Sequence, residues 1–258
     1  MLAYDQSGTG EPLVLLHGLG SRREIWAPLV PALGATSNVI AVDLPGFGAS
    51  PAIHPGGVAE LTEAVADFCG QFDRPHLVGH STGGGIALEL GRRGLARSVT
   101  TFSPIGFWRT PGRVWGQQAL GGARRIGLAI RPLAPRIARS RAGRIAFGGL
   151  VFGHPGRLDA DTFLLNVDGM LDAPGYQAVS ASLTGYRFGE LGALADIPVT
   201  VAWGSRDLLL TFATQSRRAR AALPGAVHRT LRGCGHTPFY DDPTACVDVV
   251  RSTVSRAG

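Results

Sequence analysis

The sequence predicts an α/β fold: a doubly wound, mostly parallel sheet with an inserted helical cap. Its 258 residues are 45% apolar and 17% charged, which is typical of a globular chain that buries a sizeable core. Short apolar, β-branched runs alternate with helical patterns along most of its length, and this alternation is typical of parallel sheets covered by helices. The alternation breaks once, between residues 105 and 190.

Six apolar runs predict the strands. Each run is nearly continuously apolar rather than alternating, so we expect a parallel sheet that is buried on both faces. The predicted strands are 13–17, 38–43, 76–80, 98–103, 198–204 and 227–231.

Five segments between and after these strands have helical patterns, namely 24–34, 60–71, 84–95, 212–222 and 243–255. Ser21 and Glu24 have the spacing of a capping box and predict the start of the first helix. Asp242 followed by Pro243 predicts the N-terminus of the last helix.

Residues 105–190 predict a helical cap. Proline, glycine and arginine punctuate short apolar segments there, and a loop of this length is unusual inside a compact domain. The core domain would then comprise 1–104 and 191–258. We expect the cap over the carboxyl ends of the strands, where open α/β sheets bind ligands.

Composition excludes several classes of protein. All 25 basic residues are arginine, so neither a P-loop lysine nor a Schiff-base lysine is available. The seven histidines show no metal-ligand spacing, and we expect neither metal nor cofactor. The three cysteines are far apart, which indicates reduced thiols. No signal peptide or transmembrane run is recognisable, so the expected location is the cytoplasm.

Ser81 is the candidate nucleophile. In LVGHSTGGG it directly follows a predicted strand and precedes a predicted helix, with Gly79 and Gly83 on either side. A nucleophile on so tight a turn has a strained backbone, and side chains two residues away on either side would collide. The placement predicts a serine hydroxyl raised above the end of the sheet.

A serine hydroxyl needs a base, and the base needs a carboxylate that orients it. Asp207 lies three residues beyond a late predicted strand, and His236 lies in a glycine-bounded loop after the last one. An oxyanion hole requires N–H donors where negative charge develops. We expect these donors to be the backbone amides of Leu19 and Thr82.

Five motifs together resemble the α/β-hydrolase superfamily, of the esterase, lipase and carbon–carbon-bond hydrolase type with a helical cap. They are LVLLHGLGSRREIW, VIAVDLPGFGAS, VGHSTGG, WGSRD and GCGHTPFYDDP. The resemblance implies the order serine, acid, histidine, which Ser81, Asp207 and His236 follow. It also implies that the chain begins at what is usually the second strand. Relatives with an aspartate nucleophile, the epoxide hydrolases and dehalogenases, are excluded by Ser81.

Other polar residues in these motifs are expected to have structural roles. Asp241 and Asp242 are rivals for the acid, but they lie only five and six residues after His236, and a helix cap suits Asp242 better. The remaining residues of this kind are His17, His80, Asp43 and Cys234.

Four aromatic residues are candidates for lining the substrate pocket: Trp26, Phe107, Trp108 and Phe239. Burial in the core is an equally open interpretation for them, because aromatic side chains are buried by default.

The favoured function is a serine hydrolase that cleaves a carboxylic ester through an acyl-enzyme. A carbon–carbon bond hydrolase acting on a vinylogous diketone, a lactonase and a thioesterase use the same residues and stay open. A ligand receptor of this fold with slow or single turnover also stays open.

Charge is unevenly distributed. Ten arginines and no acidic residue lie between Gly106 and Leu158, whereas the rest of the chain has 15 arginines and 19 acidic residues. This pattern leaves open a solvated surface, an anionic substrate, an acidic carrier protein or an anionic membrane surface as the partner of the cap. No nucleic-acid motif accompanies the arginines, so we expect no nucleic-acid partner.

Overall fold

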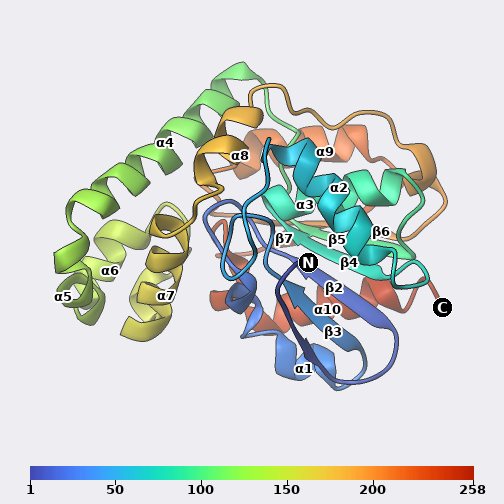
Figure 1. Ribbon diagram of the computed structural model, residues 1–258, viewed down its shortest axis with the longest axis horizontal. Coiled ribbons are helices and arrows are strands. Elements are labelled where there is room, and N and C mark those ends of the chain that lie inside the picture. The colour runs from blue at the N-terminus through green and yellow to red at the C-terminus, as the bar shows by residue number, and fades with distance from the viewer.

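A computed structural model describes residues 1–258 and contains one seven-stranded sheet (Figure 1). The strand order is β1-β3-β2-β4-β5-β6-β7, and all neighbours except β1 and β3 are parallel. All six predicted strands are present, and the α/β fold class is confirmed. The strands are β1 Tyr4–Ser7, β2 Pro12–Leu16, β3 Asn38–Val42, β4 His76–His80, β5 Ser98–Phe102, β6 Val199–Gly204 and β7 Val227–Leu231.

The first strand corrects the expectation that the sheet begins at 13–17. Tyr4–Ser7 pairs antiparallel with β3 at the edge of the sheet, and all four of its residues are exposed. Its sequence, YDQS, lacks an apolar run because this edge contributes no residue to the buried core. The strand therefore shows no hydrophobic signal in the sequence.

Helices cover both faces of the sheet. On one face lie α2 and α3, and on the other lie α1 and α10 (Figure 1). Alternate residues of β2 point to opposite faces: Val14 and Leu16 pack in one apolar cluster, Leu13 and Leu15 in the other. The bounds of the core helices are α1 Val30–Gly34, α2 Val58–Cys69, α3 Thr82–Arg92, α9 Arg217–Ala222 and α10 Pro243–Val254.

Two predicted helices are interrupted. The segment 24–34 forms a 3₁₀ turn, Arg23–Trp26, before α1, and Pro28 between them has no N–H to continue a helix. The capping box at Ser21 was wrong, since the turn begins without a side-chain cap and the amide of Arg23 donates to Asp43 instead. The segment 212–222 forms a π-helical turn, Phe212–Ser216, followed by α9.

The predicted N-cap of the last helix is confirmed. The Asp242 side chain accepts a hydrogen bond from the amide of Ala245 at 3.0 Å, and Pro243 is the first helical residue.

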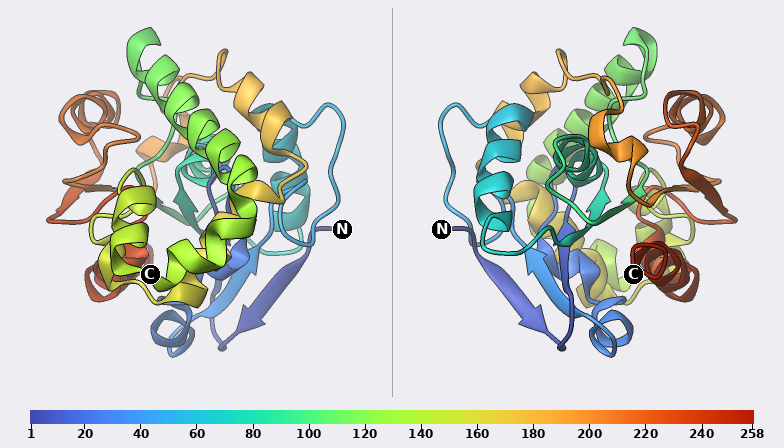
Figure 2. Two further views of the ribbon diagram at one scale, coloured as in Figure 1. Left: turned by 90° about the vertical axis from the view of Figure 1, so that its left-hand side faces the viewer. Right: turned by 90° about the vertical axis from the view of Figure 1, so that its right-hand side faces the viewer.

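Between β5 and β6 the chain forms helices and no strand. We call these helices the helical insertion, and its main elements are α4 Thr110–Ala129, α5 Ala134–Arg139, α6 Arg141–Gly148, α7 Ala160–Leu171 and α8 Tyr176–Ser182. In the left view of Figure 2 the long helix α4 runs diagonally across the molecule. None of the helices is both long and apolar enough to cross a membrane.

Candidate active site

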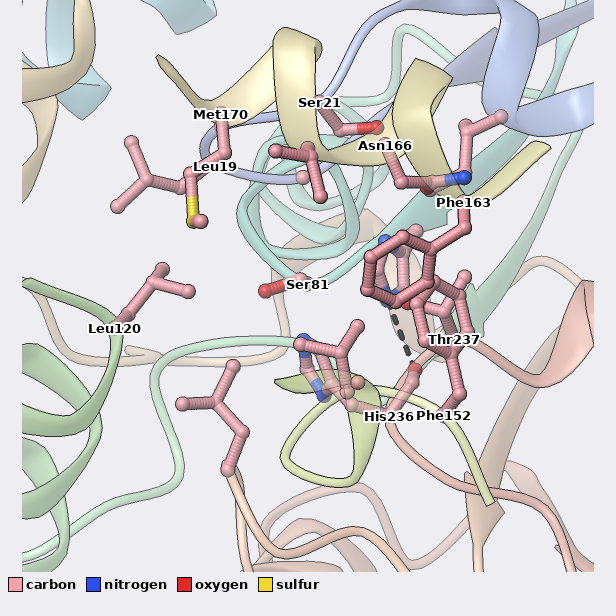
Figure 3. Close-up of a pocket in the computed structure, with 18 of the residues that line it drawn as sticks. Leu19, Ser21, Ser81, Leu120, Phe152, Phe163, Asn166, Met170, His236 and Thr237 are labelled. Carbon is pink, nitrogen blue, oxygen red and sulfur yellow. Dashed lines mark hydrogen bonds between the residues drawn. The ribbon is translucent and has the colours of Figure 1, made fainter. Parts of the chain in front are cut away.

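Ser81 lies between β4 and α3 with a strained backbone, φ 52° and ψ −112°. The flanking glycines are required by contact: a Cβ on Gly79 would lie 2.2 Å from the carbonyl oxygen of Gly83, and one on Gly83 would lie 2.2 Å from that of Leu16. This is the tight strand–turn–helix geometry that the sequence predicts for a nucleophile elbow. In Figure 3 the Ser81 hydroxyl points into a cavity.

His236 and Asp207 form a buried pair. Nδ1 of His236 lies 2.8 Å from Oδ2 of Asp207, and both residues are 3% exposed. The other carboxylate oxygen, Oδ1, accepts hydrogen bonds from the amides of Leu209 and Leu210 at 3.0 and 2.8 Å. Because a carboxylate only accepts, Nδ1 carries the imidazole proton and Nε2 is the basic nitrogen. His236 and Ser81 line the same cavity.

Two backbone amides next to Ser81 have no protein acceptor. They belong to Leu19, in the loop after β2, and to Thr82, the first residue of α3. Both residues border a cavity that Ser81 also lines. Free N–H groups at this position can bind a developing oxyanion.

The two histidines of the motifs hold the loops around the site. Nδ1–H of His17 donates to the backbone oxygen of Gly18, and Nε2 of the same ring accepts from the amide of Leu44. Burial lowers the pKa of His17 to about 4. Nε2–H of His80 donates to the backbone oxygen of His236 at 2.9 Å. Burial and the neighbouring His236 hold the pKa of His80 well below its ordinary value. Both rings are neutral, and His80 positions the loop that contains His236.

The acidic residues outside the pair stabilise loops. Asp43 is fully buried and binds the amides of Arg23 and Ala49 and the Arg23 guanidinium. Asp241 accepts hydrogen bonds from the amides of Gly153, His154 and Gly235 at 2.8–2.9 Å. Asp241 thus ties the helical insertion to the loop of His236.

Cys234 is a packing residue. It is 1% exposed, and burial raises the pKa of its thiol to about 12, so it holds no thiolate at neutral pH. No group of three or more histidine, cysteine, aspartate or glutamate side chains is arranged to hold a metal ion.

The cavity at Ser81 has a volume of about 110 Å³ and mostly apolar walls. Its apolar side chains come chiefly from the helical insertion (Figure 3). They are Leu19, Ile25, Leu120, Phe147, Val151, Phe152, Phe163, Val167, Met170 and Leu209. Sequence reasoning missed these side chains, and of these residues it named Leu19 alone, for its backbone amide. The only signal for part of them was the spacing of Phe163, Val167 and Met170 along one face of a helix.

The predicted pocket aromatics need correction. Trp26 and Phe239 are fully buried and pack together, with ring centroids 4.4 Å apart, in the core between the sheet and α10. Phe107 packs on Phe188. None of these three lines a cavity at Ser81, because they fill the core. Of the four, only Trp108 borders such a cavity.

This second cavity at Ser81 is smaller, about 30 Å³, and contains polar groups. Its lining includes Arg113, Tyr176 and Thr82. The hydroxyls of Tyr176 and Thr82 and Nε of Arg113 are buried without a hydrogen-bond partner. Such atoms favour a polar occupant, because an unpaired buried polar group costs about 1–3 kcal/mol.

A family model described as "Alpha/beta hydrolase family" matches residues 13–249. The chain belongs to this family. It is similar to an uncharacterized protein of Mycobacterium tuberculosis, 29% identical over 96% of this chain and 76% of that protein. A shorter likeness, 40% identity over 34% of this chain and 35% of the other, is to the pimeloyl-[acyl-carrier protein] methyl ester esterase of Aeromonas hydrophila.

Among solved structures, the fold resembles that of a thermophilic esterase from Thermogutta terrifontis. The TM-score is 0.73 at 23% identity, over 99% of this chain and 93% of that one. The enol-lactonase from Burkholderia xenovorans LB400 has the same fold, with a TM-score of 0.75 at 21% identity, over 98% and 96% of the two chains. The family and these likenesses support a hydrolase.

Proposed function

We propose that the protein is a serine hydrolase that cleaves carboxylic esters through an acyl-enzyme on Ser81. The observation that carries the proposal is the Asp207–His236 pair at 2.8 Å, whose histidine lines one cavity with a serine on a strained elbow. The esterase similarity of part of the chain supports the ester as the bond that is cleaved.

In the proposed reaction, Nε2 of His236 takes the hydroxyl proton of Ser81 as Oγ bonds to the ester carbonyl carbon. Asp207 stabilises the imidazolium, and the amides of Leu19 and Thr82 bind the carbonyl oxygen as it becomes negative. The imidazolium then gives its proton to the departing alcohol. A water molecule, deprotonated by His236, repeats the sequence on the acyl-enzyme and releases the acid and Ser81.

A substrate panel tests this proposal against its alternatives. We expect repeated turnover of simple carboxylic esters, with acyl-enzyme on Ser81 detectable by mass spectrometry after rapid quenching. Thioesters, lactones and vinylogous diketones are the comparison substrates. A higher kcat/KM on one of these would reassign the bond that is cleaved, and a single event per molecule on every substrate would indicate a receptor.

The arginines of the helical insertion point to an anionic partner. Of the ten between Gly106 and Leu158, Arg131 alone has an acidic partner, Asp172 at 2.6 Å with Asp168 nearby. Large apolar side chains are exposed on the same helices, α4 to α6 and the turn between α4 and α5: Val114, Trp115, Ile126, Leu128, Leu133, Ile145 and Phe147. Exposed cations among exposed apolar groups fit a lipid surface better than a soluble anion. We therefore propose that the insertion binds an anionic lipid surface.

Reversing three exposed arginines of the insertion, Arg136, Arg139 and Arg141, to glutamate should strongly weaken this binding. Each arginine near an anionic surface contributes about 1 kcal/mol, so we expect at least a hundredfold weaker cosedimentation with phosphatidylglycerol vesicles. Hydrolysis of a small neutral ester should not change. The control reverses three exposed arginines elsewhere, Arg217, Arg220 and Arg229.

The salt dependence of vesicle binding and the control variant test whether the insertion binds an anionic lipid surface. We expect vesicle binding to weaken steeply with salt, since attraction between exposed charges is screened over about 8 Å at physiological ionic strength. Equal vesicle binding by both triple variants would contradict the proposal. A charge effect on a soluble anionic ester without vesicle binding would instead indicate an anionic substrate or an acidic carrier protein.

A further inference from the structure

A third cavity, larger than either of the two at Ser81, lies within the helical insertion. It has a volume of about 370 Å³, is partly open to solvent, and is formed by α4, α5, α6 and α7 with the turns between them. No charged or hydrogen-bonding side chain lines it. The lining residues are Ala119, Ala123, Ile126, Gly127, Ile130, Ala134, Ile137, Ala146, Phe147, Leu150, Phe163, Val167 and Met170.

The space arises from the sequence of α4. Ala119, Ala123 and Gly127 are four residues apart and share one face of the helix, so their side chains leave room beside it. The facing wall is supplied by larger residues of α7. Beside the cavity, the buried side chains Ala138, Phe152 and Leu158 pack together with the lining residue Phe163, which keeps the cavity walls in place.

The cavity adjoins the cavity at Ser81. Four side chains line both of them: Phe147 from α6, and Phe163, Val167 and Met170 from α7. Figure 3 shows Phe163 and Met170 in the wall of the pocket that Ser81 also lines. Met170 also packs against Gly20, directly after the Leu19 amide. The predicted nucleophile therefore lies at one end of a continuous apolar surface that extends between the helices.

We propose that this cavity binds the acyl chain of the substrate, and that the substrate is an ester of an aliphatic acid. The inference rests on the proposed function, since Ser81 must attack the ester carbonyl. A wall without polar side chains cannot compensate the desolvation of a polar acyl group, whereas a hydrocarbon chain gains free energy from the burial. The polar alcohol portion then lies toward Arg113 and Tyr176, in the smaller cavity.

A chain-length series of p-nitrophenyl esters, from acetate to laurate, tests the inference. We expect kcat/KM to rise with chain length, by up to about fourfold for each methylene that enters the cavity. A profile that is flat or falls beyond butyrate would overturn the proposal. Such a result leaves the ester reaction at Ser81 untouched, because acetate turnover and labelling of Ser81 test that reaction separately.

Filling the cavity separates its role from general effects of the insertion. Ala123→Trp places a large side chain in the cavity, and Ala129→Trp puts the same side chain on an exposed position of the same helix. We expect Ala123→Trp to lower kcat/KM for laurate by about a hundredfold, equivalent to losing three to four buried methylenes, and to leave acetate unchanged. Ala129→Trp should change neither substrate.

A variant on another helix guards against misfolding of Ala123→Trp. Ala146→Trp alters an exposed lining residue of α6 and should give the same selective loss. Equal loss on acetate and laurate in both filled variants, with circular dichroism and thermal unfolding unchanged, would overturn the proposal.

Discussion

Replacing Ser81 with alanine should lower ester hydrolysis by about a millionfold, because the hydroxyl that forms the acyl-enzyme is removed. A fluorophosphonate should label the native protein at Ser81 and should not label the variant. Alanine keeps the Cβ on the strained backbone, so the fold and its thermal unfolding should be nearly unchanged. The measurements are kcat/KM on p-nitrophenyl acetate and mass spectrometry of the labelled peptide.

Ser103 provides the matched control. It follows β5 directly, as Ser81 follows β4, at the carboxyl ends of the parallel strands. It is 1% exposed and also has a positive φ, 45°. Its hydroxyl has no hydrogen-bond partner. Ser103→Ala should retain both labelling and turnover. Labelling that persists in Ser81→Ala would contradict the assignment of the nucleophile.

Asp207→Asn should lower kcat/KM by about ten-thousandfold without unfolding the protein. The amide oxygen of asparagine can still accept from Leu209 and Leu210, so the loop is retained. The amide nitrogen instead donates to Nδ1 of His236, which moves the ring proton to Nε2 and removes the base. The steady-state kcat/KM and the rate of fluorophosphonate labelling should fall together.

Asp241→Asn is the control for this second prediction. Asp241 is the carboxylate nearest to His236 in the sequence, but its partners are three backbone amides. We expect a loss of about 1–2 kcal/mol in the free energy of unfolding and little loss of turnover. If Asp241→Asn abolishes turnover and Asp207→Asn does not, the acid has been assigned to the wrong residue.

The sequence alone determined the α/β architecture, the six strands of the buried sheet and the positions of Ser81, Asp207 and His236 along it. These features are local: a strand buried on both faces requires a run of apolar residues, and a tight turn requires the glycines at 79 and 83. The carboxyl ends of parallel strands all lie at the same end of the sheet, so residues that follow different strands come close together there.

Tertiary structure alone decided the walls of the site. Trp26, Phe107 and Phe239 are of a residue type that often lines pockets, but they lie in the core. Phe152 and Met170 line the cavity instead. No short-range pattern distinguishes these two fates, because they depend on how the helices of the insertion pack. The edge strand Tyr4–Ser7 and the role of Asp43 in place of the Ser21 cap likewise depend on partners distant in sequence. A cavity exists only where side chains from several elements fail to fill the space between them, and that volume is a property of the packed chain.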